Sequence, residues 1–327
     1  MLIPPKYILT PKISELLSSI EVSRQIIDSI QIPPEIEMNI KRQSILKSSL
    51  FSARIEGNNL TLDDLQTKSS KDNKKTEVFN ILKGLNLILD TSGRNTTLKQ
   101  ILQLHGIVMN NLSENLGRFR TEVSAIFNAA GIALYMPPPP SQIQFLMEKL
   151  IRFINLKKER FVPIKACLSH FVFEKIHPFL DGNGRVGRLL LQSILHKGGY
   201  GMKGMLSLEE YLDSNRSLYY RSLEDTDKDV TDYLEFMLEA IAVTAKFAKD
   251  KVMQKKEFEA EDFLLPRRSE ILNTIKDQRV VNFDQIRRRF MAVNERTLRY
   301  DLKKLADGGF IIKRGTTKGV YYEAKSA

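Results

Sequence analysis

The sequence has very little cysteine, no long apolar run and no signal-like start. Cys167 is the single cysteine among 327 residues, so no disulfide can form within the chain, and its apolar helical surroundings favour core packing over a catalytic thiol. No apolar stretch approaches the roughly 18 residues that a membrane span needs. The first residues, MLIPP, lack the basic and apolar regions of a secretory signal. We therefore expect a cytoplasmic protein without a membrane anchor.

Acidic residues are scarce toward the end of the chain. The formal net charge is +11, and residues 265–327 hold 15 Lys/Arg against 7 Asp/Glu, a net +8 in that stretch. A basic segment of this size suggests a polyanionic partner. The length predicts two or three domains, and we place them at residues 1–95, 96–250 and 265–327.

One stretch concentrates chemically useful residues: residues 177–188, with the sequence HPFLDGNGRVGR. It lies between two apolar segments that we expect to be helices, residues 163–176 and 185–196. Gly182 and Gly184 remove side chains where the backbone must turn and approach a ligand. The free N–H groups at a helix N-terminus bind anions, so this pattern indicates a phosphate-binding loop.

The charged residues of the stretch extend this interpretation. Arg185 and Arg188 are three apart, so they share a helix face, and guanidinium groups suit phosphate oxygens. Asp181 offers an oxygen ligand to Mg²⁺, and His177 can accept a proton near neutral pH. A plain helix–helix turn with a surface histidine is the alternative, but the density of such groups within twelve residues favours a nucleotide site.

The stretch resembles the signature of the Fic family, H-x-F-x-(D/E)-G-N-G-R-x-x-R, with every position filled. Members of this family transfer AMP from ATP to a hydroxyl group of a target protein. The resemblance implies that His177 deprotonates the hydroxyl and that Asp181 holds Mg²⁺ on the phosphates. The implied nucleotide-binding residues are Gly182, Asn183, Gly184, Arg185 for the β-phosphate and Arg188 for the γ-phosphate.

A second motif lies upstream, at the end of a helix expected over residues 35–56. Ser52 and Glu56 are four apart and share a face, and Gly57 suits a helix stop. Alone, the pair would be interpreted as solvated surface residues. The segment resembles the Fic inhibitory motif (S/T)-x-x-x-E-(G/N), which implies that Glu56 pairs with Arg188 and blocks the site of the γ-phosphate.

The remaining core segments carry weaker signals. Residues 117–140 have strand-like residues and predict a β-hairpin, which the resemblance implies is the flap that holds an extended segment of the target by strand addition. A helix is expected over residues 208–248; there Asn215 and Tyr220 are candidates for the adenine pocket, with helix packing as the alternative. We interpret His105 and His170 as packing residues.

The basic tail predicts three helices and a hairpin, which together resemble a winged helix-turn-helix. Asn282, with Gln285 three residues later, predicts a capping box for the second helix. Protein docking or dimerisation is the alternative to DNA binding. The DNA-binding candidates, facing away from an apolar stripe on the third helix or lying in the wing, are Arg296, Arg299, Tyr300, Lys303, Arg314 and Lys318.

The predicted fold is therefore mainly α: a Fic-type helical catalytic domain with a hairpin flap, followed by a small α+β winged-helix domain. The predicted function is protein adenylylation, with ATP and Mg²⁺ as substrate and cofactor, autoinhibited by Glu56. One alternative is a DNA-binding regulator whose Fic unit senses nucleotide or modifies itself. Another is transfer of UMP or phosphate, or AMP removal; a phosphorylating relative has lysine where this chain has Gly184. Expected partners are a target protein, duplex DNA and a second copy of the chain.

Overall fold

The computed structural model describes residues 1–66, 72–90, 95–127, 133–156, 158–224, 226, 228–254, 261, 264–290, 293–315 and 319–325. The chain divides into two compact units. Unit 1 comprises Met1–Gln31, Lys41–Leu65 and Ser69–Met253; unit 2 comprises Ile32–Ile40, Gln66–Lys68 and Gln254–Ala327. The domain boundaries set from the sequence stay a prediction. None of the helices described is long and apolar enough to cross a membrane.

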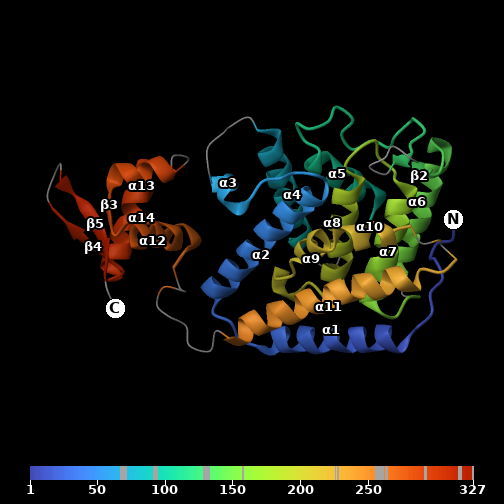
Figure 1. Ribbon diagram of the computed structural model, residues 1–327, viewed down its shortest axis with the longest axis horizontal. Coiled ribbons are helices and arrows are strands. Elements are labelled where there is room, and N and C mark those ends of the chain that lie inside the picture. The colour runs from blue at the N-terminus through green and yellow to red at the C-terminus, as the bar shows by residue number, and fades with distance from the viewer. Residues whose placement is uncertain are drawn as a thin grey trace. The chain divides into compact units, whose positions relative to one another are not determined.

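Unit 1 is helical with one small hairpin (Figure 1). Its elements are α1 (Pro11–Ser29), α2 (Pro34–Ile55, entering from unit 2), α4 (Asn73–Leu89), α5 (Leu98–Val108), β1 (Ile126–Phe127), β2 (Ala133–Tyr135), α6 (Pro140–Asn155), α7 (Val162–Ile176), α8 (Asn183–Lys197), η1 (Met202–Gly204), α9 (Leu208–Ser214), α10 (Arg216–Ser222) and α11 (Thr231–Gln254). The short α3 (Leu62–Gln66) follows α2.

The core of unit 1 is built around α7 and α8. These helices pack on each other, and α8 also packs on α4 and α5 while α7 packs on α6; Figure 1 shows α8 in the middle of the unit. Most residues of both helices are buried; in α7 this follows from a largely apolar sequence, whereas α8 also buries Asn183, Arg185 and Arg188. The loop between them, residues 177–182, is therefore held between two well-packed, largely buried helices.

Several expected elements differ from those observed. The helix expected over residues 208–248 is three helices, with one break at Asn215 and another between Ser222 and Thr231. At the first break, Asn215 Nδ2 donates to Tyr211 O at 3.0 Å. Side-chain bonds of this kind compete with helix continuation. The hairpin pairs Ile126 with Tyr135, and residues 128–132 lie outside the description.

Unit 2 contains α12 (Pro266–Gln278), β3 (Val280–Asn282), α13 (Phe283–Arg289), α14 (Glu295–Asp307), β4 (Ile311–Arg314) and β5 (Tyr321–Ala324). The strands form an antiparallel sheet in the order β3-β5-β4. The predicted capping box of Asn282 and Gln285 is present. The sequence analysis missed β3 because three residues carry no pattern of their own, and the strand exists through its pairing with β5. The winged-helix assignment stays a prediction.

Leu298→Ala should destabilise unit 2 selectively. Leu298 is fully buried in a core with Ile271, Ile286 and Leu302, and a Leu→Ala cavity costs about 2–5 kcal/mol. Hydrogen exchange on the whole chain should show reduced protection in α12 and α14 with α7 and α8 unchanged. Lys303→Ala, an exposed position on the same helix, is the control. Equal loss of protection in α7 would contradict two separate cores.

Candidate active site

The loop between α7 and α8 has two left-handed residues at its ends. His177 terminates α7 with φ 49° and ψ 60°, and Gly182 precedes α8 with φ 81°. A left-handed conformation is costly for a histidine, so the surrounding contacts must impose it. The turn places His177 beside the start of α8, whose first N–H groups lack intrahelical partners.

Asn183 fixes the inside of the loop. Its Oδ1 accepts from Phe179 N and its Nδ2 donates to Phe179 O, both at 2.8 Å, and Asn183 is only 3% exposed. Phe179 is fully buried. Sequence analysis placed the Asn183 side chain on the nucleotide; in this structure the side chain braces the loop, which leaves its backbone N–H for a ligand.

His105 also supports the loop. Its ring stacks on Phe179 with centroids 3.8 Å apart. Gly117 N donates to Nδ1 at 2.9 Å, so Nε2 carries the hydrogen and donates to Asp181 O at 3.1 Å. Burial lowers the pKa of His105, in keeping with a neutral ring. His105 thus does more than the packing expected of it, because it holds the backbone of the motif.

Arg120 joins the loop to the hairpin segment, and sequence analysis missed it. Its Nε donates to His177 O at 2.8 Å, its backbone N donates to Pro178 O at 2.9 Å, and Nη1 donates to Glu122 O at 2.8 Å. Nη2 donates to Pro138 O on the far side of the hairpin. Arg120 is 4% exposed. An isolated arginine in a loop gives no sequence signal for this role.

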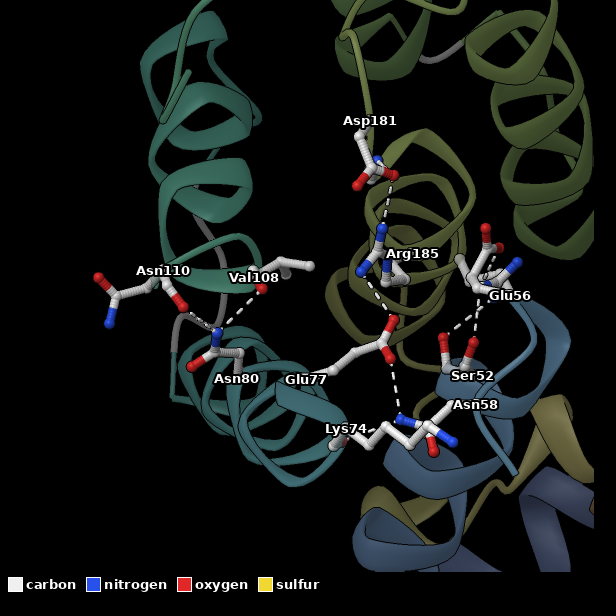
Figure 2. Close-up of polar contacts among 12 residues, drawn as sticks. Ser52, Glu56, Asn58, Lys74, Glu77, Asn80, Val108, Asn110, Asp181 and Arg185 are labelled. Atoms are coloured by element: carbon white, nitrogen blue, oxygen red, sulfur yellow. Dashed lines mark hydrogen bonds and ion pairs between the residues drawn. The ribbon is translucent and has the colours of Figure 1, made fainter. Parts of the chain in front are cut away.

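The segment at the end of α2 reaches Arg188, as the resemblance to the inhibitory motif implied; Figure 2 shows Ser52 and Glu56 in this segment. Arg188 is 1% exposed; its Nε donates to Ser52 Oγ at 3.0 Å, and its Nη2 donates to Ser52 O at 2.9 Å and to Glu56 Oε1 at 2.8 Å. Burial works against the charge, but Glu56 keeps the pKa of Arg188 above its ordinary value. A Cβ on Gly184 would collide with Glu56 Oε1, so this carboxylate fills the space over the start of α8.

Arg185 lies between two carboxylates. Its Nη1 donates to Glu77 Oε1 and its Nη2 to Asp181 Oδ1, both at 2.7 Å. The Arg185 side chain is 7% exposed, Glu77 14% and Asp181 63%. Arg185, the expected phosphate ligand, is therefore paired with Asp181, the expected metal ligand. Its second partner is Glu77, which was not predicted from the sequence.

The described residues suit Mg²⁺ only if phosphates supply some of its other ligands. The described residues include no group of three His, Cys, Asp or Glu side chains that could hold a metal. Asp181 is one exposed carboxylate beside the start of α8. Since Mg²⁺ keeps several waters and is bound by one or two carboxylates plus phosphates, this single ligand suits it.

Behind the loop lies a buried acid and histidine cluster. Burial raises the pKa of Glu174 to about 8, despite the opposing effect of Arg188, and its Oε1 has no hydrogen-bond partner in the described part of the chain. Burial lowers the pKa of His170 to about 3; this ring is hydrogen-bonded to Tyr219 and Tyr233. Burial also lowers the pKa of His177, so that its ring is neutral at pH 7 and able to accept a proton.

The two adenine-pocket candidates are engaged elsewhere. Asn215 bonds within its own helix end. Tyr220 donates from its hydroxyl to Ile55 O at 3.1 Å, at the end of α2, and burial raises its pKa to about 12, with Glu56 adding to the effect. Tyr220 thus lies beside the end of α2, and the side-chain hydrogen bond of Asn215 is local. The place of both residues in an adenine pocket stays a prediction.

A comparison with known families matches residues 95–195 to the Fic/DOC family. The chain thus contains a Fic domain, of which the signature loop and the hairpin are parts. The inhibitory segment and α4 lie outside the matched residues.

The curated relatives include "Protein adenylyltransferase Fic" of Drosophila mojavensis, 29% identical over 197 residues, which are 56% of this chain and 38% of that protein. The corresponding Drosophila erecta protein is also 29% identical over 197 residues, or 39% of its length. This chain therefore spans about two fifths of the relatives that it matches.

Two solved structures share the fold. A Fic family protein from Desulfovibrio desulfuricans G20 has a TM-score of 0.68 at 22% identity, with 99% of this chain and 98% of that one covered. Fic-1 from C. elegans has a TM-score of 0.59 at 21% identity, with 74% and 72% covered.

Glu174→Gln should stabilise the protein at pH 7.5 but not at pH 4. The folded state holds the Glu174 proton up to about pH 8, whereas the unfolded chain loses it near 4.5. Between these values the folded state binds one more proton, so the free energy of unfolding falls as pH rises. Glu174→Gln removes the titrating group and with it this fall, so the free energy of unfolding should rise by on the order of a few kcal/mol at pH 7.5.

Urea unfolding of unit 1 at the two pH values provides the measurement. Glu210→Gln, which alters an ion pair with Lys47 on the surface, serves as the control and should show no such pH-dependent gain. An equal gain at pH 4 and pH 7.5 for Glu174→Gln would be inconsistent with a buried protonated acid.

Proposed function

We propose that this chain is a protein adenylyltransferase. In the reaction, ATP and a hydroxyl side chain of a target protein give protein–O–AMP and diphosphate. The Fic domain and the relatives named protein adenylyltransferases support the class of reaction. The finer proposal rests chiefly on one observation: the loop that begins at His177 leads directly into the N-terminus of α8, the helix that bears both motif arginines.

His177 is the general base. It takes the proton of the target hydroxyl on a ring nitrogen, the hydroxyl oxygen attacks the α-phosphorus, and the bond to the β-phosphate oxygen breaks to release diphosphate. The lowered pKa of His177 keeps the ring unprotonated at neutral pH. Its Nδ1 is buried without a partner among the described residues, and Arg120 fixes its backbone through the carbonyl.

The start of α8 holds the phosphates. Its free N–H groups and positive dipole end favour anions, and Gly184 lets the backbone approach closely. Arg185 contacts the β-phosphate and Arg188 the γ-phosphate. Asp181 is the residue that would hold Mg²⁺, which neutralises charge on the phosphate oxygens when bound.

Glu56 is an intramolecular inhibitor. It occupies Arg188, and its carboxylate lies over Gly184, where an incoming phosphate would meet a like charge. The γ-phosphate seats only after this carboxylate leaves. Ser52 remains bonded to Arg188 through its carbonyl and hydroxyl, so Ser52 supports the arginine in either state.

The target and the adenine occupy the two sides of this phosphate site. The β1–β2 hairpin is fastened to the loop by Arg120 and to α7 by Tyr135, whose hydroxyl donates to Lys175 O at 2.9 Å. A hairpin held this way offers an extended target segment a strand to pair with. Tyr220 stays a candidate for the adenine side because it lies at the end of α2, next to Glu56.

Glu56→Gly should raise AMP transfer about tenfold or more. Two unit charges about 4 Å apart at an effective dielectric of 20 interact by roughly 4 kcal/mol, and a third of that is about tenfold in productive ATP binding. The measurement is the transfer of label from α-³²P ATP, with intact mass confirming the added group and UTP as the competing donor.

His177→Ala in the Glu56→Gly background is the control for the chemical step, and its rate of AMP transfer should be about 10²–10⁴-fold lower. Arg188→Ala should not reproduce the activation, because it removes the inhibitor's partner and the phosphate ligand together. Equal rates of AMP transfer for wild type and Glu56→Gly would show that Ser52 and Glu56 have a purely structural role.

A second candidate function is DNA binding by unit 2. On α14 the apolar residues Leu298, Leu302 and Leu305 are buried, while the opposite face exposes Arg296, Arg299, Tyr300 and Lys303. An exposed basic helix face of this kind suits phosphate and base-edge contacts in a major groove. Arg314 lies on β4 with Glu323 as its partner, and Lys318 lies outside the described residues. The Fic unit would then act as a nucleotide sensor or self-modifying enzyme.

The whole chain should bind duplex DNA with an affinity that falls steeply between roughly 50 and 200 mM salt. The double variant Arg296→Ala/Arg299→Ala should weaken binding and reduce the salt slope by about 2, because each arginine that binds a phosphate accounts for about one unit of that slope. Lys149→Ala/Arg152→Ala on α6, with the same charge change, is the matched control for fluorescence anisotropy. Absence of binding at 50 mM salt would favour protein docking by unit 2.

A further inference from the structure

We propose that Glu77 on α4 is a positioning residue for Arg185, and that Asn58 holds Glu77 in place. This inference rests on the proposed nucleotide site and adds to it a support that lies outside the residues matched to the Fic/DOC family. The side chains involved form one chain of contacts, Asn58–Glu77–Arg185–Asp181 (Figure 2).

The two carboxylates on Arg185 have different surroundings. The Asp181 side chain is 63% exposed, whereas that of Glu77 is 14% exposed. When Asp181 turns to a cation on the phosphates, it leaves Arg185. A guanidinium as buried as this one still requires an anionic partner, and Glu77 is the one that stays.

The release of Asp181 frees the donors that a phosphate needs. The Arg185 Nη2 then loses its present acceptor, and its Nε is buried without a partner in the described part of the chain. Nη1 remains on Glu77 at 2.7 Å. Anchored at one nitrogen, the rigid guanidinium presents the remaining donors in a fixed direction, which is what bidentate binding of a phosphate requires.

Asn58 holds the Glu77 side chain, and Asn80 holds the helix that bears it. Asn58 Nδ2 donates to Glu77 Oε2 at 2.9 Å and to Lys74 O at 2.9 Å, so Asn58 bonds both the side chain and the helix that bears it. Three residues farther along α4, Asn80 Nδ2 donates to Val108 O at 3.1 Å and Asn110 O at 2.7 Å. These contacts fasten α4 to the end of α5 and make it a rigid support.

Asn58 also connects this support to the inhibitory segment. Its backbone N donates to Ala53 O at 3.1 Å at the end of α2, and its side chain is almost fully buried. Residues 52–58 therefore bind Arg188 directly, through Ser52 and Glu56, and orient Arg185 indirectly, through Glu77. The swing of the Glu56 side chain alone opens the γ-phosphate position, while Arg185 stays aligned.

A rival interpretation treats Glu77 as a second inhibitor that repels phosphate as Glu56 does. The two interpretations predict opposite signs. If Glu77 repels phosphate, both Glu77→Gln and Glu77→Ala tighten ATP binding. If Glu77 positions Arg185, Glu77→Ala weakens binding, and Glu77→Gln weakens it less, because the amide oxygen still accepts from Nη1.

The test is made on the whole chain in the Glu56→Gly background. Calorimetry of ATP with Mg²⁺, on variants that also carry His177→Ala, gives Kd without turnover, and α-³²P ATP gives KM and kcat on the variants with His177 intact. We expect Glu77→Ala to raise Kd and KM about tenfold, with kcat changed less than about threefold. Glu77→Gln and Asn58→Ala should raise Kd by smaller factors. Glu239→Gln on α11, which alters a surface ion pair with Lys12, should leave all three unchanged.

Unchanged or tighter ATP binding in Glu77→Ala would overturn the proposal. If Glu77→Ala fails to fold, as thermal melting would reveal, Glu77→Gln and Asn58→Ala still decide the sign. ATP binding without AMP transfer in Glu56→Gly would refute the adenylyltransferase proposal but leave the Kd series as a valid test of Glu77.

Discussion

The structure of the site depends on the burial of two guanidinium charges. Arg188 is 1% exposed and Arg185 is 6% exposed, so neither charge is solvated and each must have protein partners. Breaking a buried pair by removing one partner is strongly destabilising. In the absence of a ligand these partners are the carboxylates of Glu56, just beyond α2, and of Glu77 on α4.

Contacts along α2 restrict which part of the segment around Glu56 can move. Ser48 donates to the buried Glu209 on α9, and Lys47 pairs with Glu210 at 3.0 Å. The helix is thus held upstream of its end, and Glu56 lies one residue beyond Ile55, its last. A switch that turns one side chain disturbs little of the core, whereas displacement of α2 would expose several buried polar groups.

The loop conformation is imposed by residues that are distant in sequence. His105 and Arg120 bond the carbonyls of Asp181 and His177, and Arg120 also ties the loop to Pro138 on the far side of the hairpin. The strained backbone of His177 persists because these bonds over-determine it. The segment that follows the hairpin and the backbone of His177 are consequently positioned by the same side chain.

The sequence by itself determined the helical class and the signature loop, because residues 177–188 carry a dense local pattern. The pairing of Glu56 with Arg188 followed only from the resemblance of residues 52–57 to the inhibitory motif, and the structure contains this pair. It also predicted the capping box at Asn282, which is a local interaction. Only the tertiary structure decided that Asn183 braces the loop, that α9 and α10 are separate, and that β3 exists. It alone brought in His105, Arg120 and Glu77, which are 57 to 108 residues from their partners. A single histidine, arginine or glutamate has no periodicity or spacing from which such contacts could be predicted. The contacts form because buried carbonyls and charges require partners, and the packing of the helices brings these side chains within hydrogen-bond distance.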